Sequence, residues 1–311
     1  MPAEPAEQSV SPEQMRAAIA TLSSPDHLSS PFGELRFFDG VPTGDTVGTV
    51  YDALDLIRGV EVFLNCLPGA SLVAFRRGLR SIGVSSPAVI ALWDPSADSR
   101  TVALTPNTTT PYGSTFLDLR AWGPTVVESP PGLLCFVDDF WQRYVADMGM
   151  AGPDQGQGGR YLYLPPGYDG EVPGGYFVYR PQTYTNWVVL RALGGVPDLK
   201  KTRIYPLARA TAPPGNRWVN ANAAFNTVHG NDFTFYEEVD ELVQEEPAEA
   251  LDAERAGQLA AIGIVRGQPF SADERARGIV ASIRPGIAGP GHLRGRIPHR
   301  ASWVLKLAST S

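Results

Sequence analysis

The chain has 311 residues, of which 43% are hydrophobic, enough apolar surface for a sizeable buried core. Lys and Arg total 26 against 33 Asp and Glu, and the net charge of −7 argues against a broad nucleic-acid surface, which needs clustered cations. Because the N-terminus shows no basic and then apolar leader and no apolar run approaches about 18–20 residues, we expect a cytoplasmic protein with neither nucleic acid nor membrane as a partner.

The first third of the chain is expected to be mostly helical. Residues 1–30 are rich in Pro, Ser and Glu, which is typical of a disordered segment, and residues 33–40 alternate enough for a short strand. A helix is expected next, since apolar side chains then recur in steps of three and four. These side chains are Val47, Val50, Tyr51, Leu54, Ile57, Val60 and Leu64. Pro68–Gly69 is predicted to break this helix, and a second helix is expected over about 71–80.

From about residue 88 the pattern changes to short apolar runs punctuated by Gly and Pro. The runs are VIALW, TVALT, STFLDL, TVVES, LLCFVDDF, RYLYLPP, GYFVYR and TNWVVLRAL. Eight short strands at this spacing predict a β-sandwich or barrel. The two cysteines, Cys66 and Cys135, lie in apolar surroundings without CxxC spacing, so we expect two small buried hydrophobic side chains.

The last third returns to helical periodicity. Asn231 is expected to cap one helix, Pro247 to begin another over 248–262, and a third to run from 272 to 283. The tail, residues 284–311, holds five basic residues and no acid. Such a tail either binds nucleic acid or acidic lipid, or is a disordered end without a role, and we favour the second interpretation.

Several longer blocks resemble one family. They are LRFFDGVPT, VYDALDLIRGVEVFLNCLPGASL, LTPNTTTPYG, FLDLRAWGP, GPDQGQGGRYLYLPPGYDGEVPGGYFVYRPQTY, FNTVHGNDFTFYEEV and IGIVRGQPF. On these blocks the chain, over about residues 30–283, resembles the family catalogued as domain of unknown function 1254. The resemblance implies an immunoglobulin-like sandwich and a small helical domain, followed in relatives by a jelly-roll, domain of unknown function 1214.

The patterns and the resemblance together predict an α+β protein, in which helices precede an immunoglobulin-like β-sandwich and a small helical domain follows it. The expected divisions are a disordered segment at 1–30, helices plus sandwich at 31–212, a helical domain at 213–283 and a basic tail at 284–311. The resemblance ends near residue 283 without the jelly-roll, so we expect a truncated or frameshifted product with uncovered apolar surface.

Standard catalytic and metal-binding motifs are missing from the sequence. It has no GxSxG elbow, P-loop, HExxH, EF-hand loop or Cys/His cluster, and the resemblance implies no catalytic residues. The Gly-rich GPDQGQGG at 152–159 is predicted to be a hairpin loop whose glycines adopt positive φ. The sequence therefore predicts no metal site and identifies no cofactor.

The loop TPNTTTPYG, residues 105–113, is the first candidate for a site. Its two prolines stiffen it, and Asn107 and the Thr hydroxyls can form Asx- and ST-turns with neighbouring backbone groups. These features predict either a rigid corner without a function or a rigid corner that holds binding groups. In the second case Asn107, Thr110 and Tyr112 are the expected ligand contacts.

Further candidates lie in two other segments. His229 has a carboxylate nearby in the sequence and could act as a general base near neutral pH, although a hydrogen bond to its own loop explains it as well. Asp138 and Asp139 follow LLCFV, where adjacent strand residues point to opposite faces. One is expected to pair with Arg143 and the other to face a cavity. Trp141 belongs to a dense aromatic set, which forms either core or the lining of a pocket for an apolar ligand.

Three functions remain open. The first is binding or transformation of a small organic molecule between Asn107, Tyr112, Asp139, Trp141 and His229. Asp139 or His229 would then be the general base and Asn107 or Tyr112 the polar stabiliser. The second is a non-catalytic interaction or scaffold module that associates into a homo-oligomer. The third is an inactive truncated remnant of a longer protein.

Overall fold

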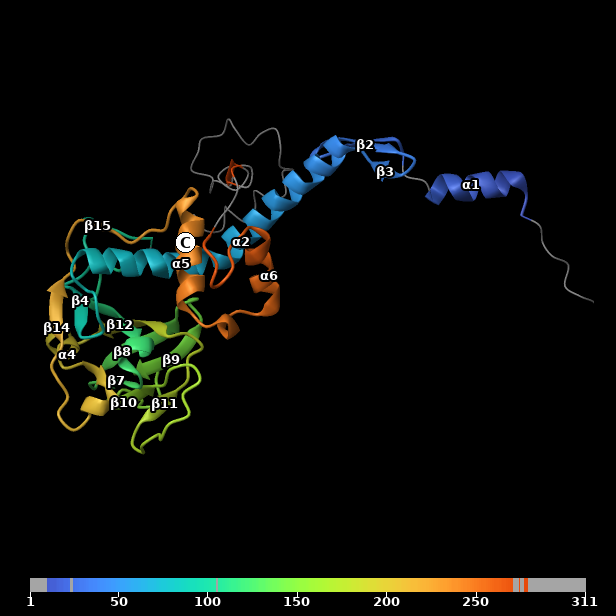
Figure 1. Ribbon diagram of the computed structural model, residues 1–311. Coiled ribbons are helices and arrows are strands. Elements are labelled where there is room, and N and C mark those ends of the chain that lie inside the picture. Colours follow the sequence, from blue (N-terminus) through green and yellow to red (C-terminus); the bar gives the residue numbers. More distant parts are fainter. Residues whose placement is uncertain (1–9, 23–24, 105, 271–273, 275–276, 279–311) are drawn as a thin grey trace, which may run out of the picture. The chain divides into compact units, whose positions relative to one another are not determined.

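The computed structural model describes residues 10–22, 25–104, 106–270, 274 and 277–278. Contacts between Cα atoms divide the chain into two compact units, the first with the described residues up to Ile57 and the second with the described residues from Arg58 onward. The long helix α2, Gly44–Ser81, contributes residues to both units (Figure 1). The predicted basic tail and most of the predicted helix at 272–283 lie outside the described residues.

The first unit contains a short helix, a three-stranded sheet and the start of α2. Its elements are α1 Pro12–Leu22, β1 His27–Ser30, β2 Gly33–Phe38 and β3 Val41–Pro42, with the strands in the order β1-β2-β3. The Thr46 hydroxyl accepts a hydrogen bond from Arg36 N at 2.7 Å and donates one to Arg36 O at 2.9 Å, which joins β2 to the first turn of α2. Residues 1–30, expected to be disordered, thus include α1 and β1, although α1 buries none of its side chains.

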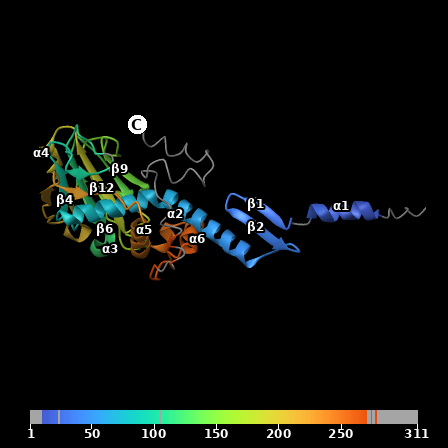
Figure 2. The same ribbon diagram turned by 90° about the horizontal axis from the view of Figure 1, so that it is seen from above.

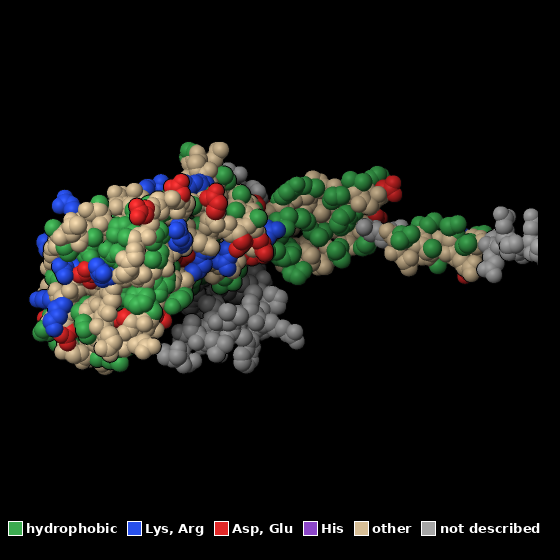
Figure 3. Space-filling view, turned by 90° about the horizontal axis from the view of Figure 1, so that it is seen from below, with side chains coloured by type: hydrophobic (Ala, Val, Ile, Leu, Met, Phe, Trp, Pro, Cys, Tyr) green, Lys and Arg blue, Asp and Glu red, His purple; other side chains and the backbone are tan. Residues whose placement is uncertain are grey.

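Almost nothing in the first unit is buried. Among its described residues up to Ile57, only Thr46 and Ala53 are buried. Apolar side chains of α2 are exposed instead: Val47 by 37%, Val50 by 41%, Tyr51 by 59%, Leu54 by 44% and Ile57 by 41%. Figure 3 shows hydrophobic side chains gathered on the surface of this helix and of the β1–β3 sheet. The described residues of this unit form secondary structure without an apolar core, and so small a sheet is marginal in water.

The helix α2 runs without a break through Pro68 and Gly69, so the predicted helix end there is wrong. Pro68 removes one intrahelical hydrogen bond, but packing in the second unit holds the helix on both sides of it. Gly69 is required by close packing, because a Cβ at this position would lie 2.9 Å from Leu242 Cδ1 and 3.0 Å from Trp141 Cε3. The Pro–Gly pair that predicts a helix end is thus the place where α2 packs against Trp141 and Leu242.

Of the helices that the structure describes, only α2 is long and apolar enough to cross a membrane. In its most apolar stretch 44% of the residues are buried within the protein, among them Val62, Phe63 and Cys66. The core helix of a soluble protein has the same length and composition, so α2 is weak evidence for a membrane span.

The second unit is built on two larger sheets. The six-stranded sheet has the order β14-β4-β6-β12-β8-β9, and the four-stranded sheet the order β11-β10-β7-β13. The strands of the first are β4 Val89–Trp93, β6 Tyr112–Asp118, β8 Leu133–Asp139, β9 Tyr144–Gly149, β12 Thr185–Ala192 and β14 Arg217–Asn220. Those of the second are β7 Thr125–Ser129, β10 Gly159–Tyr163, β11 Phe177–Tyr179 and β13 Arg203–Pro206. A short parallel pair, β5 Thr101–Val102 and β15 Phe225–Asn226, completes the strands described in this unit.

Alternation along the strands gives the six-stranded sheet two apolar faces. Cys135 and Val137 of β8 join an apolar cluster that also holds Val127 of β7 and Tyr161 of β10, and so draws on both sheets. The strand residues that alternate with those of this cluster point to the opposite face of the six-stranded sheet. The second-unit part of α2 lies along that face (Figures 1 and 2). The α+β class is therefore confirmed.

Short helical elements and two longer helices complete the second unit. They are α3 Leu119–Trp122, α4 Val196–Leu199, η1 Leu207–Arg209, α5 Thr234–Glu245, η2 Ala248–Ala250 and α6 Ala253–Ala261. Asn231 does not cap α5, which begins at Thr234, where Asp232 accepts a hydrogen bond from the backbone nitrogen. The helix expected over 248–262 is divided into η2 and α6, because Asp252 caps α6 through Arg255 N. A separate helical domain at 213–283 stays a prediction.

Candidate functional site

A cavity of about 440 Å³ in the second unit has a largely apolar wall that is rich in aromatic side chains. Five aromatic side chains from five elements face it, Phe75 of α2, Trp93 of β4, Tyr112 of β6, Phe136 of β8 and Trp187 of β12. We call this cavity the aromatic pocket. Its volume falls within the usual range for small-molecule sites.

The strand period of two places these rings together. On β4 and β12, the side chains one position away from Trp93 and Trp187 belong to the cluster shared by the two sheets, and the tryptophans face the α2 side. The ring of Trp187 meets Phe136 edge-on with centroids 5.3 Å apart, and Phe75 at 5.5 Å. The local sequence of each strand decides which side chains share a face. Which rings meet across the sheet depends on the order and register of the strands.

Several polar side chains in the wall already have hydrogen-bond partners within the protein. Trp187 Nε1 donates a hydrogen bond to Ser114 Oγ at 2.9 Å, and Ser114 Oγ donates to Val188 O at 3.1 Å. None of the described residues that line the pocket is Asp, Glu, Lys, Arg or His. Outside the wall, the guanidinium carbon of Arg191 lies 5.8 Å from the Tyr112 ring centroid. The pocket therefore offers apolar contact and hydrogen bonding without a formal charge in its wall.

The Thr/Asn/Pro loop forms the turn that the sequence predicts, and it also borders the pocket. Asn107 Oδ1 accepts hydrogen bonds from Thr109 N at 2.8 Å and Thr110 N at 3.2 Å. Asn107 and Tyr112 line the aromatic pocket, whereas Thr110 accepts a hydrogen bond from Arg191 Nε at 3.1 Å. The rigid corner is thus present, and it holds two of the predicted contacts at one cavity.

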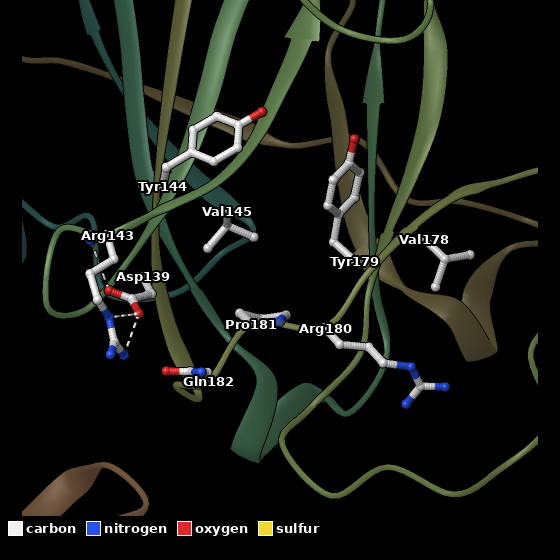
Figure 4. A pocket seen from close by; sticks show the side chains of 9 residues that line it. All are labelled: Asp139, Arg143, Tyr144, Val145, Val178, Tyr179, Arg180, Pro181 and Gln182. Atoms are coloured by element: carbon white, nitrogen blue, oxygen red, sulfur yellow. Dashed lines mark hydrogen bonds and ion pairs between the residues drawn. The ribbon is translucent and has the colours of Figure 1, made fainter. Parts of the chain in front are cut away.

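Asp139 lies at a different cavity, of about 520 Å³, with Arg143, Tyr144 and Tyr179 (Figure 4). Its carboxylate accepts hydrogen bonds from Trp141 N at 2.9 Å, Arg143 N at 2.9 Å and Arg143 Nε at 2.7 Å, and pairs with Arg143 Nη2 at 2.6 Å. This carboxylate holds the turn between β8 and β9. The expected pairing of one of the two aspartates with Arg143 is confirmed.

Trp141 and His229 lie elsewhere again. Trp141 packs beside Gly69 and lines a third cavity, of about 430 Å³, with Pro68 and Arg255. His229 Nδ1 lies 2.7 Å from Gly230 O, and its ring meets Phe235 edge-on at 5.6 Å. The predicted site residues are therefore not gathered at one cavity, and only Asn107 and Tyr112 share the aromatic pocket.

A buried carboxylate lies close to His229. Glu238 of α5 accepts a hydrogen bond from Gly230 N at 3.0 Å, and burial raises the pKa of this carboxyl to about 7. Arg77 lies 3.5 Å from its other oxygen. The surroundings of His229 are thus a packed junction between the 226–230 segment and α5, and Glu238 stabilises that junction through the backbone.

Sequence reasoning missed Phe75, Trp93, Phe136 and Gln142. Gln142 lines the aromatic pocket at the turn after β8, with a φ of 58° that non-glycine residues seldom adopt. Only the alternation of side chains along β8 could have indicated Phe136, because it puts Phe136 on the opposite face from Cys135 and Val137. No local pattern indicates that Phe75, over a hundred residues before Trp187, meets its ring.

Metal and thiol chemistry find no support in the described part of the chain. Its residues include no group of three or more His, Cys, Asp or Glu side chains that could hold a metal ion. Both cysteines are free and buried, as expected. Burial raises the pKa of each thiol to about 12, so neither is a reactive thiolate near neutral pH.

A family model described as "Protein of unknown function (DUF1254)" matches residues 88–211. The chain resembles the DUF1254 family. The match covers the loop at Asn107, β6, β8 and β12, and so most of the sheet side of the aromatic pocket. No curated protein matches this DUF1254-like chain.

The matches among solved structures include two proteins. The VPA0106 protein from Vibrio parahaemolyticus is 13% identical, with a TM-score of 0.53, over 73% of this chain and 57% of that protein. An uncharacterized protein from Burkholderia cenocepacia is 14% identical over 55% of this chain and 52% of its own, with a TM-score of 0.25. The DUF1254-like chain thus spans little more than half of each, and the Vibrio structure supports the fold alone.

Proposed function

We propose that this chain binds a small uncharged molecule with at least one ring in the aromatic pocket. The observation that carries the proposal is the convergence of five aromatic side chains on one cavity of about 440 Å³ whose described wall holds no charged side chain. Rings favour offset or edge-on contact with other rings, and the pocket presents both faces and edges. Asn107 and Tyr112 supply polar contacts at its border.

Binding is proposed here without a reaction. Asp139 and His229, the predicted general bases, lie away from the aromatic pocket, and each has backbone or ion-pair partners that explain it structurally. An acid/base reaction at this pocket would need another ionisable group.

The experiment is a calorimetric titration with indole, 4-methylphenol and cyclohexanol. We expect saturable binding of the ring compounds, with Ala103→Phe, which fills the pocket from its half-buried border, reducing affinity at least tenfold. Tyr144→Phe, on the separate cavity of Asp139, is the matched control and should leave affinity unchanged. Equal binding by Ala103→Phe and wild type would place the ligand elsewhere and end the proposal.

We also propose that the two larger sheets form the immunoglobulin-like sandwich that the family resemblance implies, as the rigid support of the pocket. The apolar cluster to which both sheets contribute supports this arrangement. The buried second-unit face of α2 and the two free cysteines favour a cytoplasmic location.

A second candidate function is self-association. Val47, Val50, Leu54 and Ile57 are exposed on α2 and follow alternating steps of three and four, the spacing of a coiled-coil seam. Because the described residues of the first unit form no apolar core, we propose that a second copy of the chain covers this seam with the same residues. Sedimentation should show a dimer at about 50 μM for wild type and a monomer for Leu54→Glu, with Leu28→Glu, on β1, as control. A wild-type monomer at that concentration would contradict it.

A further inference from the structure

Asp138 stands on the pocket side of β8. In this strand Cys135 and Val137 point into the cluster shared by the two sheets, so Phe136 and Asp138 point to the opposite face. The β8–β12 pairing is regular through this region, with Val189 opposite Phe136 and Trp187 opposite Asp138. Side chains directly opposite each other in an antiparallel pair share a face, with Cβ atoms about 5 Å apart.

That face is the wall of the aromatic pocket. Phe136, Val189 and Trp187 all line it, and so does Gln142, four residues after Asp138. Asp138 is therefore flanked along its own strand by Phe136 and across the sheet by Trp187. Asp138 does not itself line the pocket, but its place in the sheet puts it on the same face, next to this wall.

The carboxyl group of Asp138 makes no contact among the described residues that would explain it structurally. Among the described residues, no hydrogen bond or ion pair engages its side chain, whereas the neighbouring Asp139 carboxylate has four donor contacts. Asp138 is half-buried, and burial, together with the charges of Asp139 and Asp147, raises its pKa to about 6. A partly desolvated acceptor without a partner gains most from a hydrogen-bond donor brought by a ligand.

We propose that Asp138 determines the specificity of the aromatic pocket by accepting a hydrogen bond from a hydroxyl or amino group on the bound ring. This inference rests on the proposed binding function and names the class of ligand: a ring compound with a hydrogen-bond donor. The same carboxylate disfavours acidic ring compounds, because a second negative charge would then lie close to that of Asp138.

Three probes of similar size separate these effects: 4-methylphenol with a donor, toluene without one, and 4-methylbenzoate with a negative charge. At pH 8, where Asp138 is ionised, wild type should bind 4-methylphenol about tenfold more tightly than toluene and should bind 4-methylbenzoate most weakly. Asp138→Leu should remove the preference for the phenol and improve toluene binding. Asp138→Asn keeps an acceptor without the charge, so it should keep part of the phenol preference and admit 4-methylbenzoate.

The matched control is Asp169→Asn, which removes an exposed acid from a loop away from the pocket and should keep the wild-type order of affinities. If wild type binds phenol and toluene equally well, and Asp138→Leu and Asp138→Asn do the same, the inference about Asp138 is overturned while the pocket stands. If no probe binds wild type, the binding function itself fails and the inference falls with it. Circular dichroism and the melting temperature of each variant distinguish lost folding from lost binding.

Discussion

Two regions of this molecule use apolar residues in opposite ways. In the second unit, described residues of 58–270 bury three apolar clusters, and β4 is buried along its whole length. In the first unit, the described residues leave most of their large apolar side chains exposed. The contrast is visible within one helix, since Val62 of α2 is fully buried and Val50 is 41% exposed.

The difference shows that periodicity predicts an apolar face but not what covers it. Val50 and Val62 belong to the same helix with comparable local sequence, and only the second has a sheet and α5 to pack on. We infer that most of the free energy of unfolding comes from the second unit. Four tests follow from this contrast.

The largest effect is expected at Arg76. Its guanidinium is nearly buried, pairs with Glu241 at 2.8 Å and Glu245 at 2.6 Å, and lies 4.4 Å from the Phe140 ring centroid. Arg76→Ala removes both ion pairs and the contact with Phe140, while Glu241 and Glu245 keep access to water, and it should lower the free energy of unfolding by about 2–3 kcal/mol. Urea denaturation followed by tryptophan fluorescence measures it.

The control for Arg76 is Arg58, which pairs with Glu61 at 2.7 Å on an exposed stretch of the same helix. Arg58→Ala should cost less than about 0.5 kcal/mol, because solvent screens that pair. Equal losses in the two variants would show that burial does not distinguish these ion pairs.

The second test compares two valines of α2. Val62→Ala removes two buried methyl groups from the second unit and should cost about 2 kcal/mol, the transfer free energy plus a cavity contribution. Val50→Ala should change the free energy of unfolding by less than about 0.5 kcal/mol at low micromolar concentration, since this side chain is largely in water. A large loss in Val50→Ala would mean that the first unit has a core after all.

The third test compares two glycines of α2. A Cβ at Gly78 would collide with the carbonyl oxygen of Asn226 and lie 3.2 Å from Phe225 Cδ2, whereas at Gly48 it meets nothing within 4 Å. Gly78→Ala should therefore cost about 1–2 kcal/mol, or a fall of several degrees in melting temperature. Gly48→Ala should gain up to about 0.5–1 kcal/mol of helix stability. Stabilisation by both would indicate that α2 is as loosely packed near Gly78 as near Gly48.

The smallest effect concerns Asp138 and pH. With its pKa raised from 3.8 to about 6, the folded state keeps a proton between roughly pH 4 and 6 that the unfolded state has released. The free energy of unfolding should therefore fall as pH rises through that window and stay lower above it. The free energy of unfolding of Asp138→Asn should exceed that of wild type by no more than about 1 kcal/mol at pH 7, because solvent screens a half-exposed group. Below pH 4 the two free energies should be equal. Parallel pH profiles for the two proteins would contradict the shift.

The sequence by itself determined the features that depend on near neighbours. The alternation in LLCFVDD fixed which β8 side chains share a face and that only one aspartate could serve Arg143. The spacing in TPNTTTPYG specified the Asx-turn at Asn107, and the succession of helical and strand periods gave the α+β class. These outcomes need only the pleat of a strand or the reach of a short side chain.

Only the tertiary structure decided the rest. It carried α2 through Pro68 and Gly69 because Trp141 and Leu242 pack against that point, and it assigned Asp139 to a turn and Asp138 to the pocket side of the sheet. It also brought Phe75, Trp93 and Trp187 to one cavity. Strand register and helix packing bring together residues that are dozens of positions apart. They are fixed by the free energy of the whole unit, which no local pattern of side chains determines.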